Sequence, residues 1–322
     1  MKIGNTELKY GLMLAPMAGF TDRAMRLVCH KWGSEYSVSE MVSAKAVSFN
    51  DRKTHALARL MGDEGPSAVQ IFGSEPDIMM RAAETLSRGE EGGVPPVAID
   101  INMGCPVAKV FSNGEGSALM KNPDLIYRIV KAVSENISIP TTVKIRAGID
   151  GKSINAVECA QAAESAGASL VAVHGRTRVD MYSGKADLEI IKKVKQSLHI
   201  PVIANGDITS GEEAVYALSA TGADGIMVGR GAIGNPFVFS EIKAALSGES
   251  FTAPSAEERV ETALFQLRSA IEEKSERVAV REARKQIAMY LRSFKGAAKI
   301  RAEINRAETY AEVESAMRTA LV

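Results

Sequence analysis

The chain of 322 residues is 46% hydrophobic and 24% charged, a composition that supports a large buried core and excludes an intrinsically disordered or fibrous protein. Its 39 lysines and arginines balance 39 aspartates and glutamates, so the formal net charge at pH 7 is zero. A polycation that binds nucleic acid or an anionic membrane through its total charge is therefore excluded, and any phosphate-binding surface must be local.

Eight apolar runs of strand length alternate with amphipathic stretches over the first 234 residues. Between the runs lie stretches of helical period, such as the one that follows Asn122 as N-cap and Pro123 as first helical residue. Eight strand and helix units in about 240 residues predict a (β/α)8 barrel, with an open doubly wound sheet as the competing architecture. The runs are LMLAPM (12–17), YSVSEMV (36–42), AVQIFG (68–73), AIDINMGC (98–105), TTVKIRAG (141–148), LVAVHGR (170–176), PVIANGD (201–207) and GIMVGRG (225–231).

The pattern of apolar residues changes in the C-terminal part of the sequence. Residues 255–322 contain no strand-like run and predict three or four helices. The glycine, serine and proline residues of the segment 247–254 interrupt both the helical and the strand pattern of apolar residues and indicate a linker. We therefore expect a barrel domain over residues 1–246 and a small all-helical domain over residues 255–322.

The three cysteines, Cys29, Cys105 and Cys159, show neither CxxC nor Cys/His ligand spacing, so the sequence indicates no disulfide framework and no metal site. No apolar stretch approaches the roughly 20 residues that span a bilayer, and the N-terminus lacks a signal-peptide core. We expect a cytoplasmic protein with no membrane attachment. No segment indicates an obligate protein partner.

Polar residues concentrate at the C-terminal ends of the predicted strands. In a barrel these ends form the mouth, where polar residues are read as functional, because a buried polar group without a partner is costly. The concentration predicts a polar ligand in the mouth. The residues are Glu40, Gln70, Asn102, Cys105, Lys144, Arg146, His174, Arg176, Asn205, Asp207 and Arg230.

The seventh and eighth strands end in Asn205-Gly206-Asp207 and Gly229-Arg230-Gly231. Loops after these two strands commonly hold a phosphate in barrels, since glycines allow backbone N–H groups to approach it and an arginine adds a forked donor. An Asn-Gly pair alone indicates only a tight turn. The adjacent GRG favours the phosphate site.

The segment GRGAIG (229–234) also fits the dinucleotide fingerprint G-x-G-x-x-G. That fingerprint belongs to a first βαβ unit, whereas seven predicted strands precede this segment and only helices follow it. A phosphate site at the last strand explains the glycines equally well.

Three strand-end residues carry candidate chemistry. Lys144 has three possible roles. It can be a fixed cation beside developing negative charge, an amine that forms a Schiff base, or a lysine paired with a carboxylate inside the barrel. Cys105 follows a sharp turn at a strand end and suits a proton donor, although most single cysteines fill the core, as we expect for Cys29 and Cys159. His174 can donate to a ligand oxygen as a neutral imidazole.

The helical region carries a local positive charge. Between Arg277 and Arg306 there are nine basic residues and two acidic ones, a net charge of +7. Solvated helix faces usually mix charge signs, so this run favours a phosphate-binding face for an RNA, and we assign Arg284, Lys285 and Arg292 to it. Tyr290 and Phe294 within the run stack on bases or pack the helical core, and we favour the core.

Nine ordered motifs resemble the tRNA-dihydrouridine synthases, in particular the bacterial B-type branch, and the helical segment REARKQIAMYLRSFKGA (281–297) extends the resemblance to nearly the whole chain. Any one motif alone is weak, whereas the ordered set is specific. The motifs are LAPMAGFTD (14–22), SEMV (39–42), VQIFG (69–73), DINMGCP (100–106), NGEGSALM (113–120), VKIRAG (143–148), VHGRT (173–177), ANGDI (204–208) and VGRGAIGNP (228–236).

The resemblance implies an FMN-dependent reduction of the C5–C6 double bond of uracil in tRNA, with NADPH or NADH as reductant. It implies that Cys105 is the catalytic proton donor and that the base is flipped out of the tRNA stack. Asn102, Arg146 and Arg176 are assigned to the tRNA substrate. The implied FMN contacts are Pro16, Met17, Ala18, Gln70, Lys144, His174, Asn205, Gly206, Asp207, Gly229 and Arg230.

Three other functions compete with this one. An FMN barrel oxidoreductase acting on a free pyrimidine-like molecule would share the phosphate loops but would have no use for the basic helices. A lyase with Lys144 as Schiff-base nucleophile would be colourless. A non-catalytic RNA-binding protein would not need the polar mouth.

Overall fold

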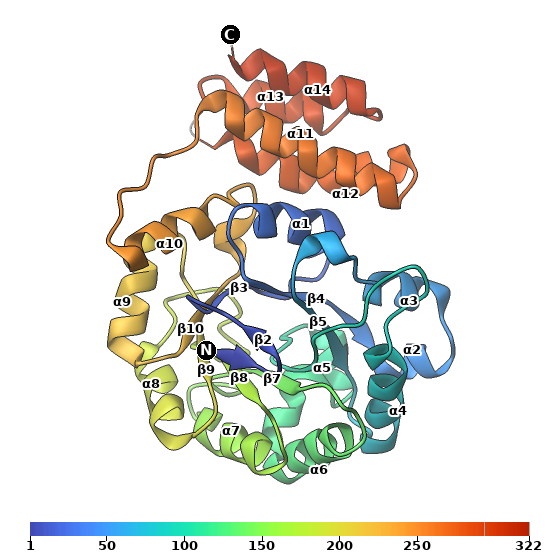
Figure 1. Cartoon of the computed structure of the whole chain (residues 1–322), viewed down its shortest axis with the longest axis vertical. Helices are drawn as coiled ribbons and strands as arrows, with labels where there is room; N and C mark the ends of the chain where they lie inside the picture. Colours follow the sequence, from blue (N-terminus) through green and yellow to red (C-terminus); the bar gives the residue numbers. More distant parts are fainter. Residues whose placement is uncertain (293, 322) are drawn as a thin grey trace.

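The computed structural model describes residues 1–292 and 294–321, which form a closed parallel barrel followed by a bundle of helices (Figure 1). Neighbouring strands pair in chain order and β10 closes the barrel against β3, so the predicted (β/α)8 barrel is confirmed and an open sheet is excluded. The strands are β3 (Leu12–Leu14), β4 (Tyr36–Ser43), β5 (Ser67–Phe72), β6 (Ala98–Met103), β7 (Thr141–Arg146), β8 (Leu170–His174), β9 (Val202–Asn205) and β10 (Gly225–Val228).

Helices surround the barrel and cover the outer faces of the strands (Figure 1). They are α1 (Arg23–Lys31), α2 (Ala44–Ser48), α3 (Arg52–Ala58), α4 (Pro76–Ser87), α5 (Ala108–Ser112), α6 (Pro123–Ser134), α7 (Ala156–Ser165), α8 (Leu188–Ser197), α9 (Gly211–Thr221) and α10 (Val238–Ser247), with 3-10 turns η1 (Gly62–Glu64), η2 (Gly116–Lys121) and η3 (Arg230–Ala232). Within the described ranges, no helix combines the length and the apolar character needed to cross a membrane.

Helix α6 illustrates how local sequence sets an element. The Asn122 side chain accepts a hydrogen bond from the Leu125 N–H at 3.1 Å, and Pro123 occupies the first helical position. Ile129 and Val133 are fully buried on one face against the barrel. The predicted cap and apolar face of this helix are confirmed.

A short antiparallel hairpin of β1 (Lys2–Ile3) and β2 (Thr6–Glu7) precedes the barrel. Ile3 and the following Leu8 are buried against inward-facing barrel residues that include Met13. We did not predict this hairpin because strands of two residues are too short to show an alternating pattern.

The C-terminal helices form their own hydrophobic cluster, which includes Leu264, Ile287 and Val313. Tyr290 is fully buried there and donates a hydrogen bond to Gln266 Oε1 at 2.8 Å, so its predicted core position is confirmed. The helices are α11 (Ala256–Glu273), α12 (Glu276–Ile287), α13 (Ala297–Ile304) and α14 (Tyr310–Arg318), with 3-10 turns η4 (Ala288–Leu291) and η5 (Thr319–Leu321).

Apolar contacts join this bundle to the barrel. The Trp32 ring after α1 lies edge-on to Phe237, with centroids 4.4 Å apart, and Phe237 lies edge-on to Tyr290 at 6.4 Å. Gln286 of α12 donates a hydrogen bond to the Phe20 carbonyl oxygen at 3.3 Å. The bundle is therefore packed on the segment that connects β3 to α1.

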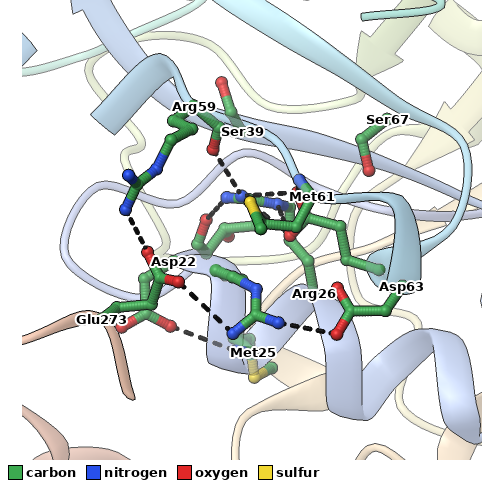
Figure 2. Close-up of polar contacts among 12 residues, drawn as sticks. Asp22, Met25, Arg26, Ser39, Arg59, Met61, Asp63, Ser67 and Glu273 are labelled. Carbon is green, nitrogen blue, oxygen red and sulfur yellow. Dashed lines mark hydrogen bonds and ion pairs between the residues drawn. The ribbon is translucent and has the colours of Figure 1, made fainter. Parts of the chain in front are cut away.

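Ion pairs reinforce the same contact (Figure 2). Glu273 at the end of α11 accepts from Arg59 at 2.7 Å and lies 3.4 Å from Arg23 of α1. Lys274 lies 3.2 Å from Asp22, the N-cap of α1. These partly buried pairs cross-link the two parts of the chain and limit how the bundle can be oriented over the barrel.

Candidate active site

One large cavity opens at the C-terminal ends of the strands, with a volume of about 660 Å³, within the ~300–1,000 Å³ range of small-molecule sites. It is lined by residues from all eight strands or the loops that follow them, and by Arg292 of the helical bundle. Cys105 and all residues that the sequence assigned to FMN lie on its wall: Pro16, Met17, Ala18, Gln70, Lys144, His174, Asn205, Gly206, Asp207, Gly229 and Arg230.

The loops after β9 and β10 form one end of the cavity. Gly206 has a φ of +126° and Asp207 a φ of +54°, and the N–H groups of both residues donate to no group among the described residues. A Cβ on Gly231 would lie 2.3 Å from the Ile208 carbonyl oxygen, so this glycine allows the two loops to meet. Free backbone donors between two glycine-rich loops make an anion site.

Asp207 organises the arginines of this end. Its Oδ1 atom lies 2.8 Å from Arg176 and 3.8 Å from Arg230, and its Oδ2 accepts from the Ala186 N–H at 2.8 Å. Arg230 is half-exposed at the cavity, with its guanidinium 4.4 Å from the ring centre of Tyr182. We therefore assign the Asp207 carboxylate to orienting Arg176 and Arg230, and the Asp207 backbone N–H to the anion.

Gly206 offers a direct test of the anion site. A Cβ at this position would lie 2.6 Å from Ala186 Cβ and 3.0 Å from His174 Cδ2. The strained backbone and this clash cost about 1–3 kcal/mol, so Gly206→Ala is expected to weaken FMN binding roughly 10- to 100-fold. Fluorescence titration of FMN measures the change, with Gly151→Ala as control because a Cβ on that exposed glycine meets nothing within 4 Å. Equal FMN affinity in both variants would contradict the assignment.

Lys144 and His174 lie beside one another in the wall. The Lys144 ammonium donates to Asn205 Oδ1 at 2.9 Å, and no carboxylate in residues 1–292 or 294–321 forms an ion pair with it, contrary to the carboxylate-paired alternative. Burial and the charge of Arg146 lower the pKa of Lys144 to about 7. Burial, together with the charge of Lys144 and nearby arginines, lowers the pKa of His174 to about 2, so its imidazole is neutral.

Cys105 lies in a clamped loop between β6 and α5. Its N–H donates to Asn102 Oδ1 at 2.9 Å, and its carbonyl oxygen accepts from the Ser117 hydroxyl at 2.8 Å. Burial raises the pKa of the Cys105 thiol, an effect that the Val107 N–H and the charge of Arg146 oppose. The thiol therefore remains protonated at neutral pH and holds a proton that it can donate. Cys29 and Cys159 are buried in the core, as predicted.

These residues fit a flavin mononucleotide. The unpaired N–H groups of Gly206 and Asp207, with Arg230, suit its phosphate. Met17 and Met227 give the wall apolar surface for a flat ring, and Lys144 supplies a charged donor for the ring's polar edge.

The residues assigned to tRNA lie in different environments. Arg146 and Asn102 line the cavity, although Arg146 is 3% exposed and its guanidinium donates to the carbonyl oxygens of Gly104, Thr177 and Met181. Arg176 is also 3% exposed, is absent from the cavity wall, and is bound by Asp207 and backbone carbonyls. Protein groups occupy its donors, and its contact with tRNA stays a prediction.

The three residues of the helical region that were assigned to tRNA also lie in different environments. Arg284 donates to the Ala307 carbonyl oxygen through Nε at 3.0 Å and also through Nη2, so it joins α12 to the segment before α14, and its contact with tRNA stays a prediction. Lys285 is exposed, with its ammonium 4.4 Å from the Phe20 ring centre. Arg292 lines the cavity. The last two residues border the mouth.

The sequence did not single out several residues of the mouth. Tyr182, on the long loop between β8 and α8, lines the cavity and is 52% exposed, with Arg146 and Arg230 on its ring. Phe20 and Met181 line it as well. No local pattern marked them, and the only available signal was the length of the loop after a strand that ends in His174.

The fold and the cavity define a (β/α)8-barrel protein with a ligand-sized cavity at the C-terminal ends of the strands. The family model described as "Dihydrouridine synthase (Dus)" matches residues 13–322, and the chain belongs to this family. The resemblance found in the sequence motifs is thereby confirmed.

Curated relatives span nearly the same length. The chain is 42% identical to tRNA-dihydrouridine synthase B of Shewanella oneidensis, covering 97% of this chain and 95% of that protein. It is 41% identical to tRNA-dihydrouridine synthase B of Vibrio vulnificus, covering 95% and 94%. A solved structure of histamine dehydrogenase from Rhizobium sp. 4-9 aligns with a TM-score of 0.56 and 13% identity over 77% of this chain and 47% of that chain, which supports the fold alone.

Proposed function

We propose that this protein is an FMN-dependent tRNA-dihydrouridine synthase that reduces the C5–C6 double bond of particular uridines, with NADPH or NADH as electron source. The observation that carries the proposal is one cavity whose wall holds two glycine-rich anion loops, a buried lysine and a protonated cysteine, in a chain of the dihydrouridine synthase family. The full-length similarity to tRNA-dihydrouridine synthases B supports tRNA as the substrate.

When bound, FMN supplies the hydride that uracil receives at C6. Gly206, Asp207 and Arg230 would hold its phosphate, Met17 and Met227 would contact its ring, and Lys144 and Gln70 would reach the polar edge of the ring. The ammonium of Lys144 places positive charge near this edge, in a site where burial strengthens electrostatic interactions.

Cys105 delivers the proton that C5 requires. Its raised pKa keeps the thiol protonated, and the Asn102 and Ser117 hydrogen bonds fix the backbone that carries it. After the step the thiolate lies beside the cationic Arg146, whose charge stabilises it. Solvent then returns the proton.

Basic residues of the C-terminal helices support tRNA binding by this part of the chain. Seven of the nine basic residues between Arg277 and Arg306 are exposed, and Lys285 and Arg292 border the mouth. A tRNA bound there would present a flipped base to the cavity. We infer that residues 1–246 perform the chemistry and residues 255–322 orient the tRNA. A cytoplasmic location stays a prediction.

The test is turnover on tRNA that lacks dihydrouridine. The purified protein is expected to be yellow and, with NADPH, to add two hydrogens to defined uridines, detected by mass spectrometry of tRNA digests. Reduction of free uracil or uridine with intact tRNA left unmodified would contradict the proposal. Colourless folded protein that does not take up FMN would contradict its cofactor.

Lys285 provides a test of the tRNA surface. Lys285→Gln removes one exposed charge at the mouth, so the slope of log K against log salt concentration is expected to fall by about one, with weaker tRNA binding. Filter binding at several salt concentrations measures this slope. Lys193→Gln, at an exposed lysine on the barrel helix α8, is the matched control. Equal slopes for the two variants would indicate that the tRNA-binding surface does not include Lys285.

A further inference from the structure

A chain of side-chain hydrogen bonds runs from the barrel interior to the Cys105 loop. Thr142 donates to Asp100 Oδ1 at 2.5 Å, and Gln70 Nε2 donates to Asp100 Oδ2 at 2.7 Å. Asn102 Nδ2 then donates to Gln70 Oε1 at 2.7 Å, and Asn102 Oδ1 accepts from the Cys105 N–H at 2.9 Å. We call these five residues the relay.

Both ends of the relay demand the same orientation of its two amides. The Asp100 carboxylate accepts only, so it requires the nitrogen of the Gln70 amide on its side. The Cys105 N–H donates only, so it requires the oxygen of the Asn102 amide. Between these ends Gln70 Oε1 meets Asn102 Nδ2, which satisfies both amides.

Asp100 lies outside the cavity wall. It is 2% exposed and does not line the cavity, whereas Gln70, Asn102 and Cys105 all do. A buried carboxylate is costly unless it is bonded, and here Thr142 and Gln70 both donate to it.

We propose that Asp100 is a positioning residue that fixes the direction of the relay and thereby orients the Gln70 and Asn102 amides and the backbone of Cys105. The inference rests on the proposed function for its catalytic consequence. A competing role is electrostatic: Asp100 lies near enough to Lys144 for its charge to affect that ammonium. The two roles make opposite predictions for isosteric variants.

Asp100→Asn removes the charge but preserves the direction. The amide oxygen of the new side chain can accept from Gln70, while its nitrogen donates to the Thr142 hydroxyl, which rotates to accept. Thr142→Val leaves the carboxylate bonded to Gln70. Each single variant is therefore expected to keep turnover within about threefold of wild type.

The double variant Asp100→Asn/Thr142→Val removes the preference for one direction at this end of the relay. In either orientation the new amide leaves one polar group unpaired against the valine, so only the Cys105 N–H still selects the direction, and an inverted relay would set a donor against that N–H. Turnover on tRNA is expected to fall roughly tenfold or more, far beyond the product of the single effects. FMN should bind more weakly by fluorescence titration, and iodoacetamide should alkylate Cys105 at a several-fold altered rate, followed by peptide mass spectrometry.

Two results would overturn the proposal. Loss of activity in Asp100→Asn alone, equal to that of the double variant, would assign Asp100 an electrostatic role. A double variant with unchanged FMN affinity, alkylation and turnover would show that the relay does not matter. If the double variant fails to fold, Asp100→Asn alone decides between the two roles, since a tenfold loss contradicts the proposal and retention excludes the electrostatic role.

Thr141→Val is the matched control, because the hydroxyl of this neighbouring buried threonine has no hydrogen-bond partner among the described residues. Failure of the proposed function is distinguishable: wild-type protein would then form no dihydrouridine. FMN affinity and Cys105 alkylation would still test the relay.

Discussion

Cys105→Ala is expected to bind FMN with wild-type affinity and to lose dihydrouridine formation by about 10²–10⁴-fold, the usual range for a positioned proton donor. The thiol is the group on the cavity wall that burial keeps protonated, and the alanine backbone can retain the bonds to Asn102 and Ser117. Rates on tRNA under saturating NADPH measure the loss.

The control for this variant is Cys159→Ala, which removes a thiol buried in the core away from the cavity. Its turnover should match that of wild type in soluble, folded protein. Wild-type turnover in Cys105→Ala would remove this residue from the chemistry and leave the proton donor to be sought among the other groups of the wall.

Lys144→Met is expected to lower turnover about 10²–10³-fold, the usual cost of removing a charge that stabilises a transition state, and to raise the thermal stability of the FMN-free protein at neutral pH. Burial and Arg146 lower the pKa of Lys144 from 10.5 to about 7. At pH values between these two, the unfolded chain binds the proton that the folded chain releases. The contribution of Lys144 to stability therefore increases with pH over this interval.

Calorimetry of the FMN-free protein tests the direction of this pH dependence of stability. The melting temperature of wild type relative to Lys144→Met should rise as the pH increases above about 7, and the difference should be largest below that value. A Lys144→Met variant that is less stable than wild type at pH 7 would mean that the lysine stabilises the fold through its bond to Asn205.

The strands were predictable because parallel strands buried on both faces appear as continuous apolar runs. Seven of the eight runs extend one to three residues beyond the strand that they contain, and those extra residues are the loops of the site, such as Gly104, Cys105, Gly206 and Asp207. The glycines of these loops were informative because backbone geometry and close approach require them.

The remaining features of the site depend on tertiary contacts and could not be predicted from the local sequence. Gln70 and Asn102 were recognised as polar strand ends, but their bond to each other and to Asp100 depends on the register between β5 and β6, which no local pattern contains. Arg176 and Arg284 are basic residues of the kind that contact phosphates. In the fold, however, the loop after β8 occupies donors of Arg176, and Ala307, between α13 and α14, occupies donors of Arg284.

The most direct test of the account is an anaerobic single turnover. Protein whose FMN has been reduced is mixed with tRNA that lacks dihydrouridine, and flavin absorbance and tRNA digests are followed together. The account predicts that tRNA oxidises the flavin with formation of one dihydrouridine per flavin, and that Cys105→Ala does so far more slowly. A flavin that stays reduced with tRNA but is oxidised by a free pyrimidine would contradict it.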